Sequence, residues 1–242
     1  MQLEDIFYAV VVSVNLVLSV RTLHFLLAKW WRQYYLLAFH LSLVVFMIVP
    51  TFASYMSLGN WKLESAHRAY WSVSTVDQFA VLLLLLQLIY RVGRELPAQG
   101  VLIRAISFVA IAAVAISIFV HMDKRLNSFM GAVTRDLTFF SAIINMVLWR
   151  FLLQLRKRDY LLLAVSAGIG IQCTGDAIGL SFRFLGGPLG QARTLMEFGN
   201  VVMALSSVIT FLIWHTAFSR SRDRRKLPAD QPEPREIEAT GA

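Results

Sequence analysis

The sequence predicts an all-α membrane protein: a polytopic transmembrane bundle of about seven helices, with its N-terminus outside and its C-terminus in the cytoplasm. Of the 242 residues, 57% are hydrophobic and only 16% are charged, whereas soluble domains average about 45–50% apolar and about 25% charged residues. The mean hydropathy is +0.60. Since water cannot solvate so much apolar surface, this composition indicates a lipid environment.

Seven segments have the length and composition of a membrane-spanning helix, which needs about 20 mainly apolar residues. Strands of a membrane barrel would alternate apolar and polar side chains, whereas the run from Phe79 to Leu86 is apolar throughout. The apolar runs therefore predict helices rather than strands. In chain order, the predicted helices are residues 6–26, 34–57, 70–90, 101–121, 136–155, 160–182 and 196–218.

The first three helices begin at recognisable signals. The first follows Glu4 and Asp5. A cleaved signal peptide would begin with a basic stretch, so we expect this helix to be retained. Aromatic residues, which favour the membrane interface, flank the turn into the second helix, and Tyr70 and Trp71 begin the third. The aromatic residues of that first turn are Trp30, Trp31, Tyr34 and Tyr35.

Arginines and glycines mark the last four helices. Arg104 and Arg150 lie near the predicted cytoplasmic ends of the fourth and fifth helices, where a long side chain can reach the lipid headgroups. In the sixth helix, Gly175 and Gly179 form a GxxxG pattern, which predicts close packing against another helix. The seventh helix follows a Gly-Gly-Pro turn at residues 186–188.

Lys and Arg residues are distributed unevenly between the two sides of the predicted bundle. Short cytoplasmic loops are enriched in Lys and Arg, so the richer side is predicted to face the cytoplasm. This orientation places the N-terminus outside. The sparser side carries Lys62, Arg68, Lys124, Arg125, Arg135, Arg183 and Arg193, and every other Lys and Arg falls on the predicted cytoplasmic side.

The connections between the predicted helices are short, so residues 1–218 are expected to form one transmembrane helical domain. Residues 219–242 begin with a basic cluster and continue into a segment containing Pro and Glu, which predicts a disordered cytoplasmic tail. The net charge is +8, and the basic residues lie between the apolar runs and in this tail. This distribution favours a membrane surface over nucleic acid as partner. We expect the protein to lie in the inner (plasma) membrane and to have lipid as its partner. A membrane-protein partner is also possible on this sequence.

Polar residues within the apolar segments predict a pocket open to the outside. Ionisable groups inside a membrane are costly and usually face the bundle interior or a water-filled cavity. At a rise of about 1.5 Å per residue, Asp77 and Asp176 both lie about 10 Å below the outer ends of their helices. The candidate ligand-binding residues are Asp77, Gln78, Asp136, Gln172, Asp176, Arg183, Glu197 and Asn200.

The same polar residues fit a second interpretation, in which they form interhelical hydrogen bonds and ion pairs that hold the bundle together. The sequence leaves both interpretations open. A ligand pocket predicts that changing Asp77 or Asp176 to Asn alters binding without preventing folding. A purely structural role predicts lower stability alone.

No catalytic residue, metal site or cofactor is predicted. His24, His40 and His215 fall toward the predicted cytoplasmic side and are the candidates for haem ligation, since histidine is a common axial ligand of haem iron. The chain contains neither HExxH nor GxSxG. Residues 173–176, Cys-Thr-Gly-Asp, lack the first Gly of the GxGD motif of intramembrane aspartyl proteases.

The basic and aromatic first turn, the Tyr70–Trp71 pair and the tripeptide Gly187-Pro188-Leu189 resemble those of the small, uncharacterised seven-helix membrane proteins of soil bacteria. The resemblance extends over residues 6–218. It implies a seven-helix fold and brings no activity or site residue with it. The first-turn residues that carry it are Arg21, Trp30, Trp31, Arg32, Tyr34 and Tyr35.

Two classes of function follow from these observations. The first is a non-catalytic membrane module that binds a small ligand or a partner through an outward-facing polar pocket. The alternative is a small-solute or proton transporter, or an intramembrane enzyme, that uses Asp77 and Asp176. The first class is preferred because the sequence contains no catalytic motif.

Overall fold

The computed structural model describes residues 3–56, 63–94, 100–154, 159–186 and 192–224. Over these residues the chain is helical apart from short turns, and no strand is present. This confirms the predicted all-α fold. The helices are α1 (Leu3–Phe25), continued by the π-helical turn η1 (Leu26–Trp30), α2 (Tyr35–Met56), α3 (Leu63–Gly93), α4 (Gly100–His121), α5 (Leu126–Leu152), α6 (Tyr160–Gly186) and α7 (Ala192–Arg224).

Six of these helices are long and apolar enough to cross a membrane. The exception is α2, whose described apolar stretch, Tyr35–Ile48, is shorter. The chain is therefore a helical membrane protein, in which hydrocarbon surrounds most outward-facing side chains. A seventh crossing by α2 and the cytoplasmic location of the C-terminus stay predictions.

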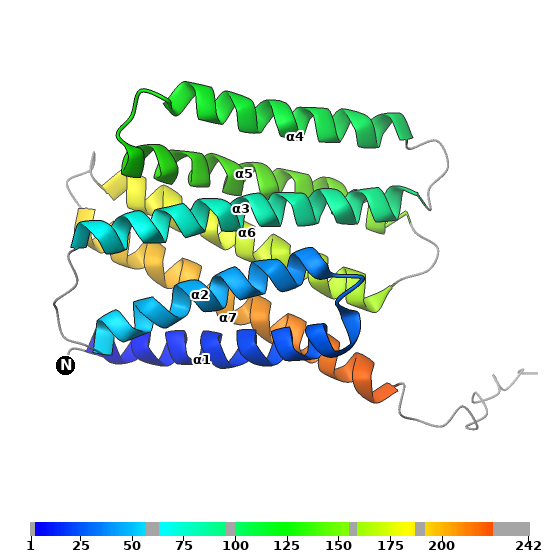
Figure 1. Ribbon diagram of the computed structural model, residues 1–242, viewed down its shortest axis with the longest axis horizontal. Coiled ribbons are helices and arrows are strands. Elements are labelled where there is room, and N and C mark those ends of the chain that lie inside the picture. Colours follow the sequence, from blue (N-terminus) through cyan, green and yellow to red (C-terminus); the bar gives the residue numbers. More distant parts are fainter. Residues whose placement is uncertain (1–2, 57–62, 95–99, 155–158, 187–191, 225–242) are drawn as a thin grey trace, which may run out of the picture.

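Six helices form a closed ring around the interior of the bundle. In the order α1, α2, α3, α5, α6 and α7, each helix contacts the next, and α7 contacts α1 (Figure 1). Leu84, Leu85 and Trp214 are fully buried in the core of this ring. The first helix begins and the last helix ends at opposite ends of the bundle (Figure 1).

The helices α6 and α7 approach each other closely along one side of the ring. A Cβ atom added to Gly179 would lie 2.6 Å from the carbonyl oxygen of Gly199, so the two backbones are in contact there. Thr210 on α7 donates a hydrogen bond of 2.9 Å to the carbonyl oxygen of Gly168 on α6. Small residues allow this approach, and the GxxxG pattern in the sequence indicated it.

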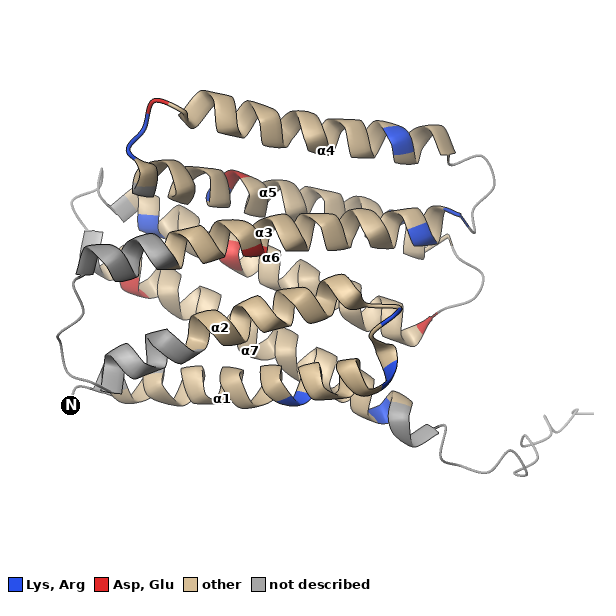
Figure 2. Ribbon diagram, in the orientation of Figure 1, with Lys and Arg blue, Asp and Glu red and all other residues tan. Residues whose placement is uncertain are grey.

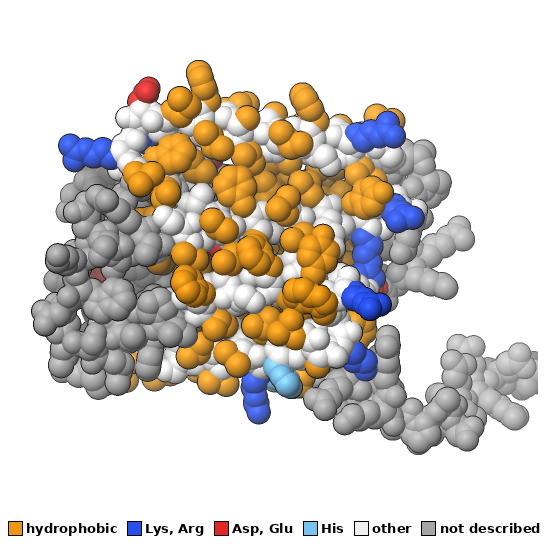
Figure 3. Space-filling model, viewed as in Figure 1, with side chains coloured by type: hydrophobic (Ala, Val, Ile, Leu, Met, Phe, Trp, Pro, Cys, Tyr) orange, Lys and Arg blue, Asp and Glu red, His pale blue; other side chains and the backbone are white. Residues whose placement is uncertain are grey.

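The helix α4 packs outside the ring, against α5 and α3 (Figure 1). Apolar side chains such as Phe108 (73% exposed) and Phe119 (76% exposed) face away from the protein, as expected for contact with lipid. Hydrophobic side chains cover much of the described surface between the two ends of the bundle (Figure 3). The buried residues of α4 form a narrow seam and are Ile103, Ala110, Ser117 and His121.

Charged side chains lie mainly at the two ends of the helices. Among the described residues, Lys and Arg gather at the end of the bundle where α7 ends (Figure 2). Residues close to that end include Arg91, Arg94 and Arg104. The sequence predicts this end to be cytoplasmic, because positive residues favour cytoplasmic loops.

Several helices extend past the predicted apolar segments. The helix α3 begins at Leu63 instead of residue 70, α5 begins at Leu126 instead of residue 136, and α7 continues to Arg224. Adding one residue to an existing helix gains one backbone hydrogen bond, so helices continue past their apolar part. The first residues of the predicted tail are therefore helical, while residues 225–242 and 187–191 lie outside the described residues.

The aromatic residues of the first turn divide between surface and core. Trp31 and Tyr35 are exposed, as the interface prediction requires. Tyr34 is fully buried instead, with the guanidinium of Arg91 5.6 Å from its ring centre and the edge of Phe218 against it. The packing of α3 and α7 over the turn decides this difference, which residue type alone does not reveal.

Candidate functional site

A cavity of about 260 Å³ lies inside the ring of six helices. Every ring helix contributes to its wall, and α4 contributes nothing. The residues from α3 follow helical spacing along one face, and so do Gln172, Asp176 and Leu180 from α6. The wall residues are Val12, Asn15, Val44, Met47, Ile48, Tyr70, Trp71, Ser74, Asp77, Gln78, Thr134, Thr138, Gln172, Asp176, Leu180, Met203, Ala204, Ser207 and Phe211.

The cavity lies in the half of the bundle that contains the first turns of α3 and the last turns of α6. This is the end that the sequence predicts to face outside. Four of the candidate residues, Asp77, Gln78, Gln172 and Asp176, meet in its wall. The rise per residue predicts that the carboxylates of Asp77 and Asp176 lie at the same depth in the membrane. In the structure both residues line the same cavity.

Asp77 forms a buried hydrogen bond with His40 of α2. The Nδ1–H of His40 donates to Oδ1 of Asp77 at 2.7 Å, and both side chains are almost completely buried. The ring of Trp214 on α7 lies edge-on to the imidazole, with 5.8 Å between ring centroids. The Nε2 atom of His40 is buried and has no hydrogen-bond partner among the described residues. His40 and Trp214 thus fix the position of the Asp77 carboxylate.

Asp176 stands in contrast to Asp77. It is half-buried in the cavity wall, and it forms no ion pair or hydrogen bond with any residue that the structure describes. Its carboxylate is therefore the group in this cavity most available to a ligand. An uncompensated carboxylate in a membrane protein is costly, which favours a functional role.

Three amide side chains in the wall are left with unpaired oxygens. Asn15 (8% exposed), Gln78 (6%) and Gln172 (7%) are more than nine-tenths buried. The Oδ1 atom of Asn15 and the Oε1 atoms of Gln78 and Gln172 have no hydrogen-bond partner in the described part of the chain. Buried polar atoms are nearly always hydrogen-bonded in native proteins, so these oxygens are exceptions, and Gln172 also lies near the imidazole of His40.

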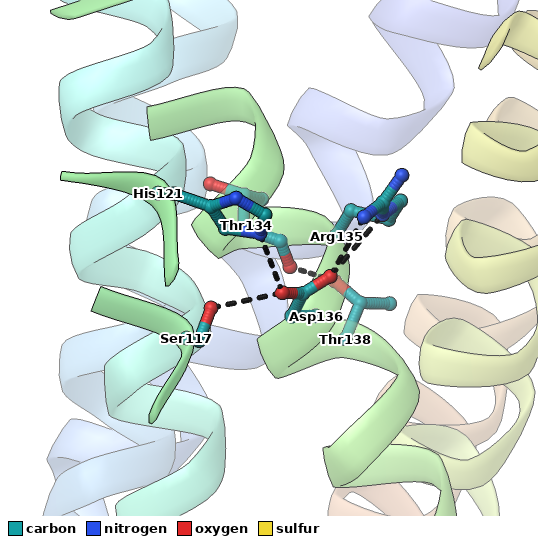
Figure 4. A network of polar contacts seen from close by, with 6 residues as sticks. All are labelled: Ser117, His121, Thr134, Arg135, Asp136 and Thr138. Carbon is teal, nitrogen blue, oxygen red and sulfur yellow. Dashed lines mark hydrogen bonds and ion pairs between the residues drawn. The ribbon is translucent and has the colours of Figure 1, made fainter. Parts of the chain in front are cut away.

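Asp136 belongs to a separate network between α4 and α5 (Figure 4). Ser117 donates to its Oδ2 at 3.0 Å, and His121 Nε2 donates to the same oxygen at 2.9 Å. Arg135 pairs with its Oδ1 at 3.0 Å. These contacts attach the peripheral helix α4 to the ring. Asp136 therefore lies outside the cavity, on the face of α5 toward α4.

The other predicted site residues also lie outside the cavity wall. Arg183, two turns along α6 from Asp176, places its guanidinium 5.8 Å from the ring centre of Trp71. Glu197 and Asn200 precede the first wall residue of α7, Met203. Arg183 therefore contacts the wall residues Tyr70 and Trp71 and forms no ion pair with either carboxylate of the cavity.

The three histidines considered for haem occupy different surroundings. His40 is buried and bonded to Asp77. His24 is exposed on α1, and His215 on α7 stacks against Phe25 with 5.5 Å between ring centroids. In the described residues, no three His, Cys, Asp or Glu side chains lie close enough together to hold a metal ion.

Some wall residues did not enter the sequence argument. One of them is Asn15 of α1. Asn15, Ser19 and Thr22 form a polar stripe at helical spacing in this mainly apolar helix. All three are buried, so this stripe was the available signal. The pairing of His40 with Asp77 had no such signal, because residues on separate helices meet only through tertiary packing.

Comparison of the chain with known proteins identifies no relative. No protein-family model matches the chain, and no curated protein or solved structure is significantly similar to it.

Proposed function

We propose that this protein is a non-catalytic membrane module that binds a small polar ligand in the cavity between its helices. The observation that carries the proposal is the wall itself: an unpaired carboxylate, Asp176, beside three buried amide oxygens without partners. A cavity of about 260 Å³ is just below the range of about 300–1,000 Å³ that is typical of pockets for drug-sized molecules. The ligand is therefore small.

The proposal includes an approach from the outer side and a location in the inner (plasma) membrane. The positive residues at one end of the bundle support this orientation (Figure 2). Lipid surrounds the ring, and the exposed apolar face of α4 is available to lipid or to a membrane-protein partner. Kinship with the small seven-helix membrane proteins of soil bacteria is also part of the proposal, and the helical bundle is consistent with it.

The test uses protein purified in mild detergent. A protein-free extract of small molecules from the host cells is added, and the thermal unfolding midpoint is followed. A ligand that binds only the folded state raises this midpoint. We expect the extract to raise it for the wild type and for Asp136→Asn, which removes a carboxylate outside the cavity, and to leave Asp176→Asn unchanged. An identical response of all three proteins, including no response, would exclude the proposed site.

The pair of His40 and Asp77 favours a second candidate, a small-solute or proton transporter that uses Asp77 and Asp176. A buried histidine bonded to a carboxylate can exchange a proton with it, and such groups occur in proton relays of transporters. Purified protein in liposomes distinguishes the two functions. Transport predicts a solute or proton flux that Asp77→Asn abolishes, whereas a binding module produces no flux. An absorption spectrum of the same preparation would reveal bound haem by its Soret band.

A further inference from the structure

We infer that the ligand of this cavity is a small organic cation, an amine or quaternary ammonium, with Asp176 as its counter-ion. This inference rests on the proposed function, because it names the ligand class of the same cavity. It is carried by the sign of the charges in the wall, by the kind of polar atom that the wall presents, and by its aromatic surface.

The charged side chains that the structure describes in the wall are Asp77 and Asp176, both acidic. No Lys, Arg or His is among the described wall residues. His40 is hydrogen-bonded to Asp77 and also lies within electrostatic range of Asp176. The nearest basic residue along α6, Arg183, lies against Trp71. A cation in the cavity would therefore meet Asp176, which forms no ion pair with any described side chain, whereas an anion would meet two carboxylates.

The wall offers hydrogen-bond acceptors besides its two carboxylates. The amides of Asn15, Gln78 and Gln172 each carry a donor NH2 group and an acceptor oxygen, and the oxygens have no hydrogen-bond partner among the described residues. The hydroxyl of Thr138 already donates its hydrogen to the carbonyl oxygen of Thr134 at 2.8 Å, and Ser207 likewise donates to a carbonyl oxygen of its own helix at 3.0 Å. The remaining lone pairs of these two hydroxyls can accept hydrogen bonds from a ligand, as an ammonium group, which carries only donors, would require.

Aromatic side chains distinguish an organic cation from a bare metal ion. Tyr70, Trp71 and Phe211 line the same cavity as the carboxylates. The faces of aromatic rings attract organic cations and contact their alkyl groups. A metal ion surrounded by oxygen ligands needs neither aromatic surface nor a cavity of about 260 Å³.

The inference is tested with three compounds that carry the same isoamyl group on a cationic, neutral or anionic head, together with two further salts. Isoamylamine is the cation, isoamyl alcohol the neutral analogue and isocaproate the anion, with choline as a quaternary ammonium and sodium chloride as the inorganic control. Binding to the purified protein is measured by calorimetry and by the shift in unfolding midpoint. We expect isoamylamine and choline to bind and stabilise the wild type, and the alcohol, the carboxylate and sodium to have no effect.

Variants of Asp176 connect this selectivity to the cavity. A charge-assisted hydrogen bond is worth about 1.5–3 kcal/mol, so Asp176→Asn is expected to weaken amine binding by roughly tenfold to a hundredfold. Asp176→Glu keeps the charge and should keep the preference for cations, and Asp136→Asn should bind like the wild type. Size-exclusion chromatography of each variant establishes that it is folded.

The outcomes separate this inference from the proposed function. If the alcohol or the carboxylate binds as tightly as the amine, or if sodium alone stabilises the protein, the organic-cation class is wrong while a ligand cavity remains. If no compound binds the wild type but the cell extract still stabilises it through Asp176, the cation inference is likewise wrong and the proposed function stands. If Asp176→Asn binds the amine like the wild type, Asp176 is not the counter-ion.

Discussion

Asp77 and Asp176 have the same side chain and share one cavity, but their surroundings differ. Asp77 is almost completely buried and accepts a hydrogen bond from His40, which compensates its desolvation. Asp176 has no such partner among the described residues. A charge that leaves water without a partner destabilises the folded protein, and binding sites retain such residues at the expense of stability. At the scale of single residues, one carboxylate has a hydrogen-bond partner and the other has none among the described residues, as the proposed ligand site requires.

This difference predicts opposite effects of the same substitution. We expect Asp77→Asn to lower the free energy of unfolding by about 1 kcal/mol, because a charge-assisted hydrogen bond becomes a neutral one. Asp176→Asn should leave the stability of the ligand-free protein unchanged or raise it, because it removes an uncompensated charge. Thermal melts of both variants in mild detergent measure this. Equal losses of stability in both would instead favour the interpretation that these residues only hold the bundle together.

At the scale of secondary structure, the helices α6 and α7 form the closest pair in the bundle. Their contact depends on the absence of side chains at Gly179 and Gly199, whose backbones touch. Since lipid gives no hydrophobic force between two membrane helices, their association depends on such close packing and on hydrogen bonds. The same two helices carry wall residues of the cavity, Asp176 on α6 and Ser207 and Phe211 on α7.

A single methyl group should therefore disturb this contact. We expect Gly179→Ala to lower the free energy of unfolding by about 1–3 kcal/mol, because overpacking forces the backbones apart. Gly100→Ala is the matched control, since a Cβ at Gly100 would meet nothing within 4 Å. Unfolding curves of the two variants and the wild type provide the comparison. If Gly179→Ala is as stable as Gly100→Ala, the two helices adapt to the methyl group without cost.

At the scale of the whole molecule, the ring places residues from six helices around one cavity, while α4 stays outside it (Figure 1). The Asp136 network attaches α4 to the ring by polar contacts near one end of the helix (Figure 4). The ends of the chain lie at opposite ends of the bundle (Figure 1). If the positive end faces the cytoplasm, the cavity opens toward the outside.

Labelling of single cysteines in intact cells tests this orientation. The chain has one cysteine, Cys173, which is buried, so replacing it with Ala gives a background without reactive thiols. Asp123 and Gln154 are exposed in turns at opposite ends of α5. We expect a membrane-impermeant maleimide to label Asp123→Cys directly and Gln154→Cys only after permeabilisation. The reverse pattern would invert the orientation and place the cavity toward the cytoplasm.

The sequence by itself determined the helical membrane class, six of the seven predicted membrane-spanning segments and most of the central residues of the described helices. These follow from hydropathy and length, because each transmembrane helix satisfies its own backbone hydrogen bonds and needs an apolar surface of fixed length. Asp77, Gln78, Gln172 and Asp176, which line the cavity, could be selected as candidates from the sequence, because ionisable and amide groups stand out in apolar runs.

Only the tertiary structure decided which polar residues meet. It joined His40 to Asp77, brought Asn15 into the cavity and moved Asp136 to the contact with α4. Helical spacing tells which residues share a face, but the rotation of each helix about its axis decides where that face points. That rotation is set by packing between helices, such as the contact of Gly179 with Gly199, and it has no signature within one segment of the chain.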